Sequence, residues 1–166
     1  MRKGLIILGD LLDTDLIWLA RSGTLRPLSD GERLIAEGER IDTLYFVTEG
    51  WFDVAVRGVQ VARLGVGDVM GEMSFVEKQG ASATVTAAGP ARVLAVSQAA
   101  LLAQFRSDEG FAARFYRALA VFLSDRLRSM APGGAGDELD EGILDALHVA
   151  GDRMLRLIAL LEGRAR

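Results

Sequence analysis

The chain has 166 residues, of which half are apolar and a quarter are charged, as in an ordinary folded domain with room for a sizeable core. Its formal net charge of −4 at pH 7 argues against a broad basic face for nucleic acid. Because it has no cysteine, disulfides and thiol chemistry are excluded.

The first residues have only a superficial likeness to a secretory signal. A basic start at residues 1–3 precedes a short apolar run at 4–9, but Asp10, Asp13 and Asp15 interrupt the pattern and no small-residue cleavage site follows. No other stretch has the length of a membrane span. We therefore expect a cytoplasmic protein without a membrane partner.

The first predicted helix covers residues 10–22. Its apolar side chains recur three to four positions apart on one face: Leu12, Leu16, Leu19 and Ala20. Asp10 or Asp13 can cap the beginning of this helix, and Gly23 ends it.

From Leu25 the hydrophobic period changes to two, which predicts β-strands. The predicted strands cover residues 34–36, 44–48, 51–57, 59–61, 82–88 and 92–96, and residues 61–64 lead from the fourth of them into the next stretch. Arg57-Gly58 forms a short hairpin turn, and Gly89-Pro90 separates the last two strands. Many short strands at such regular spacing indicate an antiparallel barrel or sandwich.

One stretch inside this region, residues 66–87, has a different pattern. Gly67-Asp68 predicts a tight turn, and Gly71 opens a single helical turn whose first amides have no partner within the helix. A polar bend and a strand follow. Free amides at a helix start can bind an anion, although the same glycine is also compatible with plain turn chemistry.

Two helices follow the last strand. Ser97 can cap a helix from Gln98 to about Phe105, and residues 107–109 begin a second helix that ends near Met130. The second helix carries an apolar stripe that we expect to cover the open side of the barrel. The stripe consists of Phe111, Phe115, Ala118 and Phe122, with Leu119, Leu123 and Leu127 beside it.

Residues 132–136 form the clearest linker, with one proline and three glycines in five positions. They divide the chain into a domain at 1–131 and an amphipathic helix at 137–166. The apolar residues of this helix alternate at spacings of four and three, as along a coiled-coil seam: Ile143, Leu147, Ala150, Met154, Leu157 and Leu161. A second copy would bury such a seam readily, so we expect a homodimer or a docking helix.

Two features together resemble the phosphate-binding cassette of cyclic-nucleotide-binding domains. The first is Gly67-Asp68-x-x-Gly71-Glu72, and the second is the run Ala-Ser-Ala-Thr-Val-Thr-Ala at residues 81–87. Such domains occur in the regulatory subunit of cAMP-dependent kinase, in bacterial catabolite activators and in nucleotide-gated channels. The likeness continues through residues 31–39 and 44–50. It implies a mainly β fold with flanking helices: a double-stranded β-helix, that is, a jelly-roll-like β-roll.

The resemblance also implies a ligand site. Family members bind the ribose 2′-hydroxyl through the cassette glutamate, here Glu72, and pair the cyclic phosphate with a cassette arginine. Counted from Gly71-Glu72 without a gap, the residue at the arginine's place is Ala81. The other residues expected to touch a ligand are Gly71, Met73, Ser82, Ala83 and Thr84.

The missing arginine changes the expected function. We expect a non-catalytic regulatory sensor module that binds cAMP or cGMP weakly or not at all, without a cofactor or metal. The alternative is a ligand-free module for protein interaction or dimerisation. In either case the sequence does not identify the effector protein that such a module would control.

An enzyme or a DNA-binding activator is disfavoured. A metal-dependent barrel enzyme needs a cluster of histidines and carboxylates, but the one histidine, His148, lies in the final helix. A nucleophile–base pair cannot be built without histidine or cysteine, short of a Ser–Lys arrangement, and lysine is nearly absent. A DNA-binding activator needs a further domain after its long helix, but only 36 residues follow Met130, and they are acidic.

Overall fold

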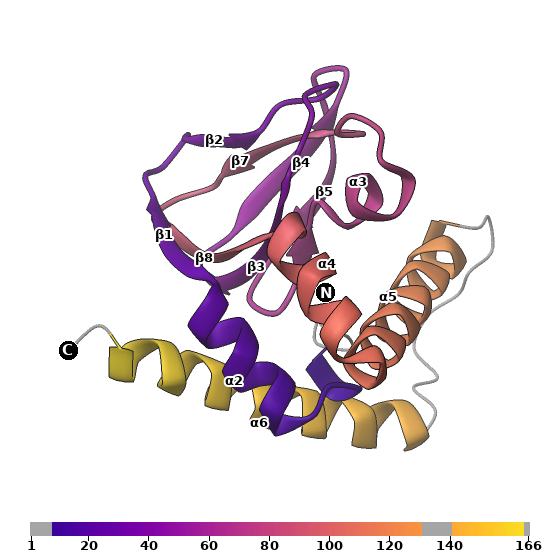
Figure 1. The fold of residues 1–166 in the computed structure, drawn as a ribbon. Helices are drawn as coiled ribbons and strands as arrows, with labels where there is room; N and C mark the ends of the chain where they lie inside the picture. The colour runs from indigo at the N-terminus through magenta and orange to yellow at the C-terminus, as the bar shows by residue number, and fades with distance from the viewer. Residues whose placement is uncertain (1–7, 131–140, 165–166) are drawn as a thin grey trace.

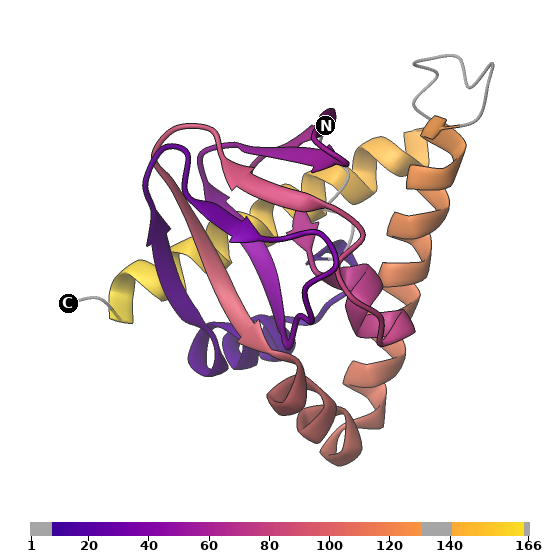
Figure 2. The same cartoon turned by 90° about the horizontal axis from the view of Figure 1, so that it is seen from above.

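The computed structural model of the chain describes residues 8–130 and 141–164. Two four-stranded antiparallel sheets face each other in a β-roll, with helices packed along one side and one end (Figures 1 and 2). The strands are β1 (Thr24–Leu28), β2 (Arg33–Ile35), β3 (Thr43–Glu49), β4 (Phe52–Val56), β5 (Val59–Leu64), β6 (Val69–Met70), β7 (Thr84–Ala87) and β8 (Ala91–Ser97). The sheet orders are β1-β8-β3-β6 and β2-β7-β4-β5. The predicted β-roll fold is therefore confirmed.

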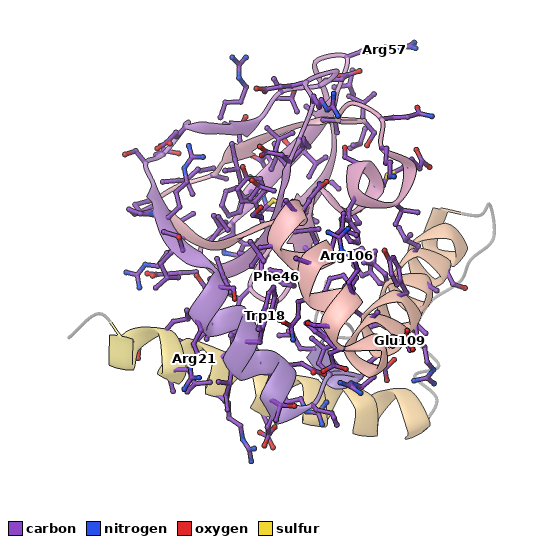
Figure 3. The ribbon with its side chains drawn as sticks, in the orientation of Figure 1. Trp18, Arg21, Phe46, Arg57, Arg106 and Glu109 are labelled. Atoms are coloured by element: carbon purple, nitrogen blue, oxygen red, sulfur yellow. The ribbon has the colours of Figure 1, made fainter. Side chains whose placement is uncertain are left out.

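The strand boundaries differ from the sequence prediction in a few places. The strand expected at 82–88 is shorter, at Thr84–Ala87, and the two-residue strand β6 lies inside the stretch that was expected to be turn and helix only. The predicted hairpin turn is present, because Arg57 and Gly58 both have positive φ angles, 50° and 79°. This pair gives the chain reversal that two-residue hairpins favour. Figure 3 shows Arg57 at the outer tip of the hairpin.

The strand β3 is covered on both faces, which its sequence pattern did not predict. Leu44 and Phe46 belong to a core between the sheet and the helices. Val47 belongs to a second core inside the roll, where it packs with Phe52 and Val93. A strand with helices outside and a sheet inside loses the polar alternation of a half-buried strand.

The first long helix begins later than predicted. The helix α2 covers Asp13–Ser22, and Leu12 rather than Asp10 or Asp13 stands at its N-cap. Leucine cannot accept a hydrogen bond from the helix, so Asp15 reaches back instead and accepts one from the Leu12 N–H at 2.8 Å. Asp10 and Asp13, the caps expected from the sequence, instead form ion pairs with other helices.

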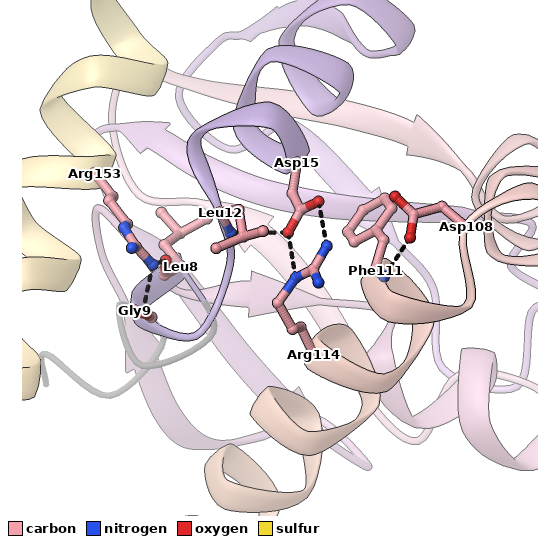
Figure 4. Close-up of polar contacts among 8 residues, drawn as sticks. All are labelled: Leu8, Gly9, Leu12, Asp15, Asp108, Phe111, Arg114 and Arg153. Carbon is pink, nitrogen blue, oxygen red and sulfur yellow. Dashed lines mark hydrogen bonds and ion pairs between the residues drawn. The ribbon is translucent and has the colours of Figure 1, made fainter.

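Three acidic residues near the start of α2 tie it to α5 (Glu109–Met130) and α6 (Glu141–Arg164). Asp15 accepts two hydrogen bonds from Arg114 at 2.8 and 2.9 Å (Figure 4). Asp10 pairs with Arg117 and Asp13 pairs with Arg156, each at 2.9 Å. Arg153 of α6 donates to the carbonyl oxygens of Leu8 and Gly9. The beginning of the described chain is therefore linked to both C-terminal helices.

Helices α4 (Gln98–Ser107) and α5 begin where the sequence predicted, and both caps are present. Ser97 accepts from the Ala100 N–H at 3.4 Å, and Asp108 accepts from the Phe111 N–H at 2.8 Å. The predicted stripe of α5 is buried in the core beside the roll and α4 at Phe111, Phe115, Ala118 and Phe122, and Leu119 beside it is buried as well. Leu123 is partly buried, and the side chain of Leu127 lies outside the described part of the chain. Figure 3 shows Phe46 and Trp18 in the layer between the roll and the helices, and the Trp18 ring meets Phe111 edge to face at 5.6 Å.

The described half of the predicted seam is buried within the chain itself. Met154, Leu157 and Leu161 pack in the same core as Leu16 and Leu19 of α2. The side chains of Ile143, Leu147 and Ala150, the linker at 132–136 and the start of the expected helix at 137 lie outside the described part of the chain. Along its described half, the seam therefore packs against this chain's own α2.

Candidate functional site

The chain turns sharply between β6 and the short helix α3 (Glu72–Glu77), and Gly71 makes this turn possible. Its φ angle is +85°, and a Cβ added there would lie 2.8 Å from the carbonyl oxygen of Thr43 in β3. Only glycine meets both conditions without strain. Gly71 therefore brings the main chain of this turn close to β3.

Helix α3 directs its side chains to opposite sides. Phe75 points into the helical core, where its ring stacks on Tyr116 and meets Phe105 and Phe115 edge to face. Glu72 and Ser74 are buried, with only 4% and 5% of their surfaces exposed. A carboxylate so deeply buried must be held in a polar environment, because transferring it into an apolar one is costly.

Residues 81–83 form a second wall of the site, and the loop that contains Gly38 holds this segment in place. The Gly38 N–H donates to the Ala81 carbonyl at 2.7 Å, and the Ala81 N–H donates to the Glu39 carbonyl at 2.8 Å. Gly80 passes so close to this loop that a Cβ would lie 2.6 Å from the Gly38 carbonyl oxygen. As a result, Ala81 is fixed in place with 7% of its surface exposed.

The beginning of α3 and residues 81–83 are two walls of a pocket in the roll. The enclosed room is about 50 Å³, and the empty space in and above it, open solvent included, is about 410 Å³. The lining residues are Ile35, Ile41, Val54, Leu64, Val69, Met70, Gly71, Glu72, Met73, Ser74, Ala81, Ser82, Ala83 and Val85.

Six of the seven residues singled out from the sequence line this pocket: Gly71, Glu72, Met73, Ala81, Ser82 and Ala83. Thr84 is outside the lining, and its hydroxyl accepts a hydrogen bond from the Glu37 N–H at 3.1 Å. The sequence pattern did not identify the apolar lining residues on β2, β4, β5, β6 and β7. Their inward alternation, as in Ile35 and Val54, was a visible signal, but the pattern did not reveal which core positions would border the pocket.

Met73 partly closes the pocket. Its sulfur lies 3.6 Å from the Ser82 hydroxyl, and 36% of its surface is exposed. The Phe75 and Phe122 side chains pack in the helical core and are absent from the pocket lining. Among these three large side chains, Met73 is the one that a ligand would meet.

Among the described residues, the pocket lining contains one ionisable side chain, Glu72, and no lysine, arginine or histidine. The strong ion pairs of the roll lie elsewhere on its surface. Hydrogen bonds from Arg63 lower the pKa of Asp53, and those from the Ser29 N–H and Arg26 lower the pKa of Glu32. None of these basic side chains belongs to the described lining of the pocket.

A second hollow of about 390 Å³ lies between α2 and α6. Its walls are Leu16, Ile17, Ala159 and Leu160, with the Asp13–Arg156 pair at its edge. Beyond that pair it offers no polar group that could orient a ligand, so the smaller pocket is the better candidate site.

Neither a metal site nor a membrane span is found within the described residues. No three histidine, cysteine, aspartate or glutamate side chains there gather closely enough to hold a metal ion. No described helix combines the length and the hydropathy that a bilayer crossing requires.

Comparison with known proteins gives consistent matches. The sequence profile of the cyclic nucleotide-binding domain matches residues 25–108, half of the chain. The Pycsar effector protein PaPycTIR of Pseudomonas aeruginosa is 37% identical over 110 residues, which are 66% of this chain and 34% of that protein. Glutaminase 2 of Bradyrhizobium diazoefficiens is 35% identical over 118 residues, 70% of this chain and 19% of that protein. The chain therefore spans only about a third and a fifth of these relatives.

Solved structures agree on the fold. A cyclic nucleotide-binding domain from Methylobacillus flagellatus superimposes with a TM-score of 0.70 at 20% identity, covering 82% of this chain and 85% of that one. The catabolite activator protein of Thermus thermophilus gives a TM-score of 0.64 at 19% identity, covering 96% and 88%. With the profile match over residues 25–108, these findings show that the chain belongs to the cyclic nucleotide-binding domain family.

Proposed function

We propose that the protein is a non-catalytic regulatory sensor module whose pocket binds cAMP and cGMP weakly or not at all. The single observation that carries this proposal is the place of Ala81. It lies buried in the pocket wall, and the described lining of that pocket contains no basic residue. In this proposal Glu72 is the acceptor for a ribose hydroxyl, and Ala81 stands where the family's phosphate-binding arginine would stand.

The energetic effect of that replacement is large. A hydrogen bond to a charged group contributes about 1.5–3 kcal/mol, and one guanidinium can make two of them to a phosphate. Leaving a buried charge without its partner costs about 3–5 kcal/mol. Either figure corresponds to a loss of roughly ten-fold to a few thousand-fold in affinity.

The runner-up is a ligand-free interaction module, and the small size of the pocket favours it. The enclosed room of about 50 Å³ is far below the roughly 300–1,000 Å³ of typical small-molecule pockets.

In both cases we propose a cytoplasmic homodimer that signals to an effector protein. Apolar side chains exposed on α6, Leu155 at 67% and Leu160 at 40%, support association. Light scattering at micromolar concentration tests it, since a monomer at 17.9 kDa contradicts the dimer.

Restoring the cation tests the sensor proposal. Ala81→Arg is expected to increase the affinity for cAMP or cGMP by roughly thirty-fold to a thousand-fold, because a bidentate contact replaces an unpaired buried charge. Calorimetric titration at millimolar ligand gives the two affinities. Ala99→Arg is the matched control, because it adds the same charge at an exposed position on α4.

A second substitution checks the role of Glu72. In the Ala81→Arg background, Glu72→Ala is expected to remove much of the gain by deleting the acceptor for the 2′-hydroxyl. If Ala81→Arg folds normally but gives no saturable heat with either nucleotide, the sensor proposal is wrong and the interaction module replaces it.

A further inference from the structure

The hollow between α2 and α6 is bordered by apolar side chains that the rest of the chain leaves partly uncovered. Ile17 on α2 and Leu160 on α6 line the hollow, and 37% and 40% of their surfaces are exposed. Leu155 is 67% exposed and lies one helical turn before the lining residue Ala159. Figure 1 shows the two helices side by side below the roll. Single exposed apolar residues are common, but several large ones around one hollow indicate an interaction surface.

The hollow is the open continuation of the buried contact between the two helices. Met154, Leu157 and Leu161 of α6 are buried in the same core as Leu16 of α2. Leu16 also lines the hollow, whose room is about 390 Å³. Water gains little from apolar walls, so filling this room with apolar side chains from a second surface is favourable.

The charges at the edge of the hollow are balanced. Asp13 of α2 and Arg156 of α6 pair at 2.9 Å, and 60% and 64% of their side chains are exposed. The whole chain has a formal net charge of −4, so two copies repel each other in most orientations. A surface with one acid and one base avoids this repulsion. A two-fold axis through it can bring Asp13 of each copy toward Arg156 of the other.

The surface therefore has what an interface between identical copies requires. A two-fold interface uses the same patch twice, so that patch must supply both the hollow and the side chains that fill it, and both signs of charge. A small molecule is a weaker candidate, because beyond the Asp13–Arg156 pair the described lining offers no polar group to orient it.

We infer that the hollow between α2 and α6 is the interface of the homodimer. Apolar side chains of each copy fill the hollow of the other, and Asp13 of each copy faces Arg156 of the other. This inference rests on the proposed function, because it uses the homodimer proposed there. It goes further by naming the surface and the charge pairs, which the predicted seam did not, since the described half of that seam is buried within the chain.

A charged substitution at Leu160 tests the apolar part of the interface. Leu160→Glu is expected to raise the dimer dissociation constant by about ten-fold or more, because association would bury a carboxylate in an apolar hollow. Val59→Glu is the matched control, because Val59 is 66% exposed on β5 and lies outside the lining. Analytical ultracentrifugation over a range of concentrations measures the dissociation constants, and thermal melting verifies that both variants are folded.

Exchanging the charges tests the pairing. Asp13→Arg gives each copy two bases at the edge of the hollow, and Arg156→Asp gives each copy two acids. Each variant alone is expected to dimerise at least about five-fold more weakly than the wild type, because like charges then face each other. A mixture of the two variants is expected to recover the association, since every facing pair then joins an acid to a base. Native mass spectrometry distinguishes the mixed dimer from the two homodimers by mass.

The outcomes separate this inference from the proposed function. If the wild type is a dimer and all three variants dimerise as strongly, the interface lies elsewhere; the inference is overturned and the homodimer stands. If both charge variants dissociate but their mixture does not recover, the proposed pairing is overturned. If the wild type is a monomer, the homodimer and this inference both fail, whereas the sensor function is tested separately by Ala81→Arg.

Discussion

Gly71 shows how one residue positions the site. It combines a positive φ angle with close approach to β3, so the beginning of α3, and with it Glu72, depends on the missing side chain. Gly58 has a similar φ angle of +79°, but no atom lies within 4 Å of the place where its Cβ would be. An alanine at position 58 would therefore meet backbone strain alone, whereas an alanine at position 71 would meet backbone strain and a steric clash.

Alanine substitution at these glycines is the first prediction. Gly58→Ala is expected to cost about 1–2 kcal/mol of unfolding free energy, the ordinary cost of a left-handed residue. Gly71→Ala is expected to cost at least about 1 kcal/mol more, because the Thr43 carbonyl must also move. Urea denaturation measures both. Equal losses would mean that the approach to Thr43 is easily relieved.

The Asp15–Arg114 pair provides the second prediction. Asp15 is 2% exposed, and the Arg114 side chain is 27% exposed. Asp15→Ala is expected to lower the free energy of unfolding by about 2–3 kcal/mol. This loss is smaller than that from breaking a fully buried ion pair, because the Arg114 side chain reaches solvent. Asp13→Ala, which breaks an exposed pair with Arg156, is the control and is expected to cost less than about 1 kcal/mol.

The pH dependence of this pair follows from its pKa shift. Hydrogen bonds to Asp15 raise the pKa of Arg114 above its already high ordinary value. A raised pKa contributes stability below the unfolded-state value and loses it only as the pH rises through the folded-state value. The stability difference between wild type and Asp15→Ala is therefore expected to stay constant between about pH 6 and pH 9. A steep change in that window would contradict this assignment.

Among the elements, α6 shows what hydrophobic spacing can and cannot predict. Its spacing predicted a seam for a homodimer or for docking, and the described half of that seam packs against α2 of the same chain. Hydrophobic spacing identifies the buried face of a helix and not the surface that covers it. The same limit applies to β3, whose two buried faces depend on helices distant in the sequence.

Paired leucine substitutions on α6 are the third prediction. Leu157 is fully buried, whereas Leu155 is 67% exposed. Leu157→Ala is expected to destabilise the protein by about 2–5 kcal/mol, and Leu155→Ala is expected to change stability by less than about 0.5 kcal/mol. Thermal and urea unfolding of both variants measure the difference. If Leu157→Ala were neutral, α6 would not be part of the folded core.

The cassette was the part of the site most accessible to sequence reasoning. The glycines and the Gly71-Glu72 pair predicted the turn and the short helix, because these positions depend on local backbone conformation. Thr84 shows where local reasoning fails, since its hydroxyl meets Glu37 from a loop 47 positions away in the chain. The apolar lining could not be assigned either, because it is contributed by five strands whose register is set by long-range pairing.

At the scale of the whole molecule, the pocket lies close to the elements that a sensor would have to move. Phe75 projects from α3 into the aromatic cluster of α4 and α5, and α5 in turn holds α2 through Arg114 and Asp15. Figure 1 shows α3 and α5 next to each other beside the roll, with α6 below. A displacement of α3 by a ligand would therefore meet α5 directly.

The central claim is that the pocket between α3 and residues 81–83 is the ligand site and that it lacks only a cation. Amide chemical-shift mapping of Ala81→Arg during titration with cAMP tests this claim most directly. The largest changes are expected at Gly71, Glu72, Ser82 and Ala83. Changes concentrated instead at Leu16 and Leu160, in the hollow between α2 and α6, would contradict it.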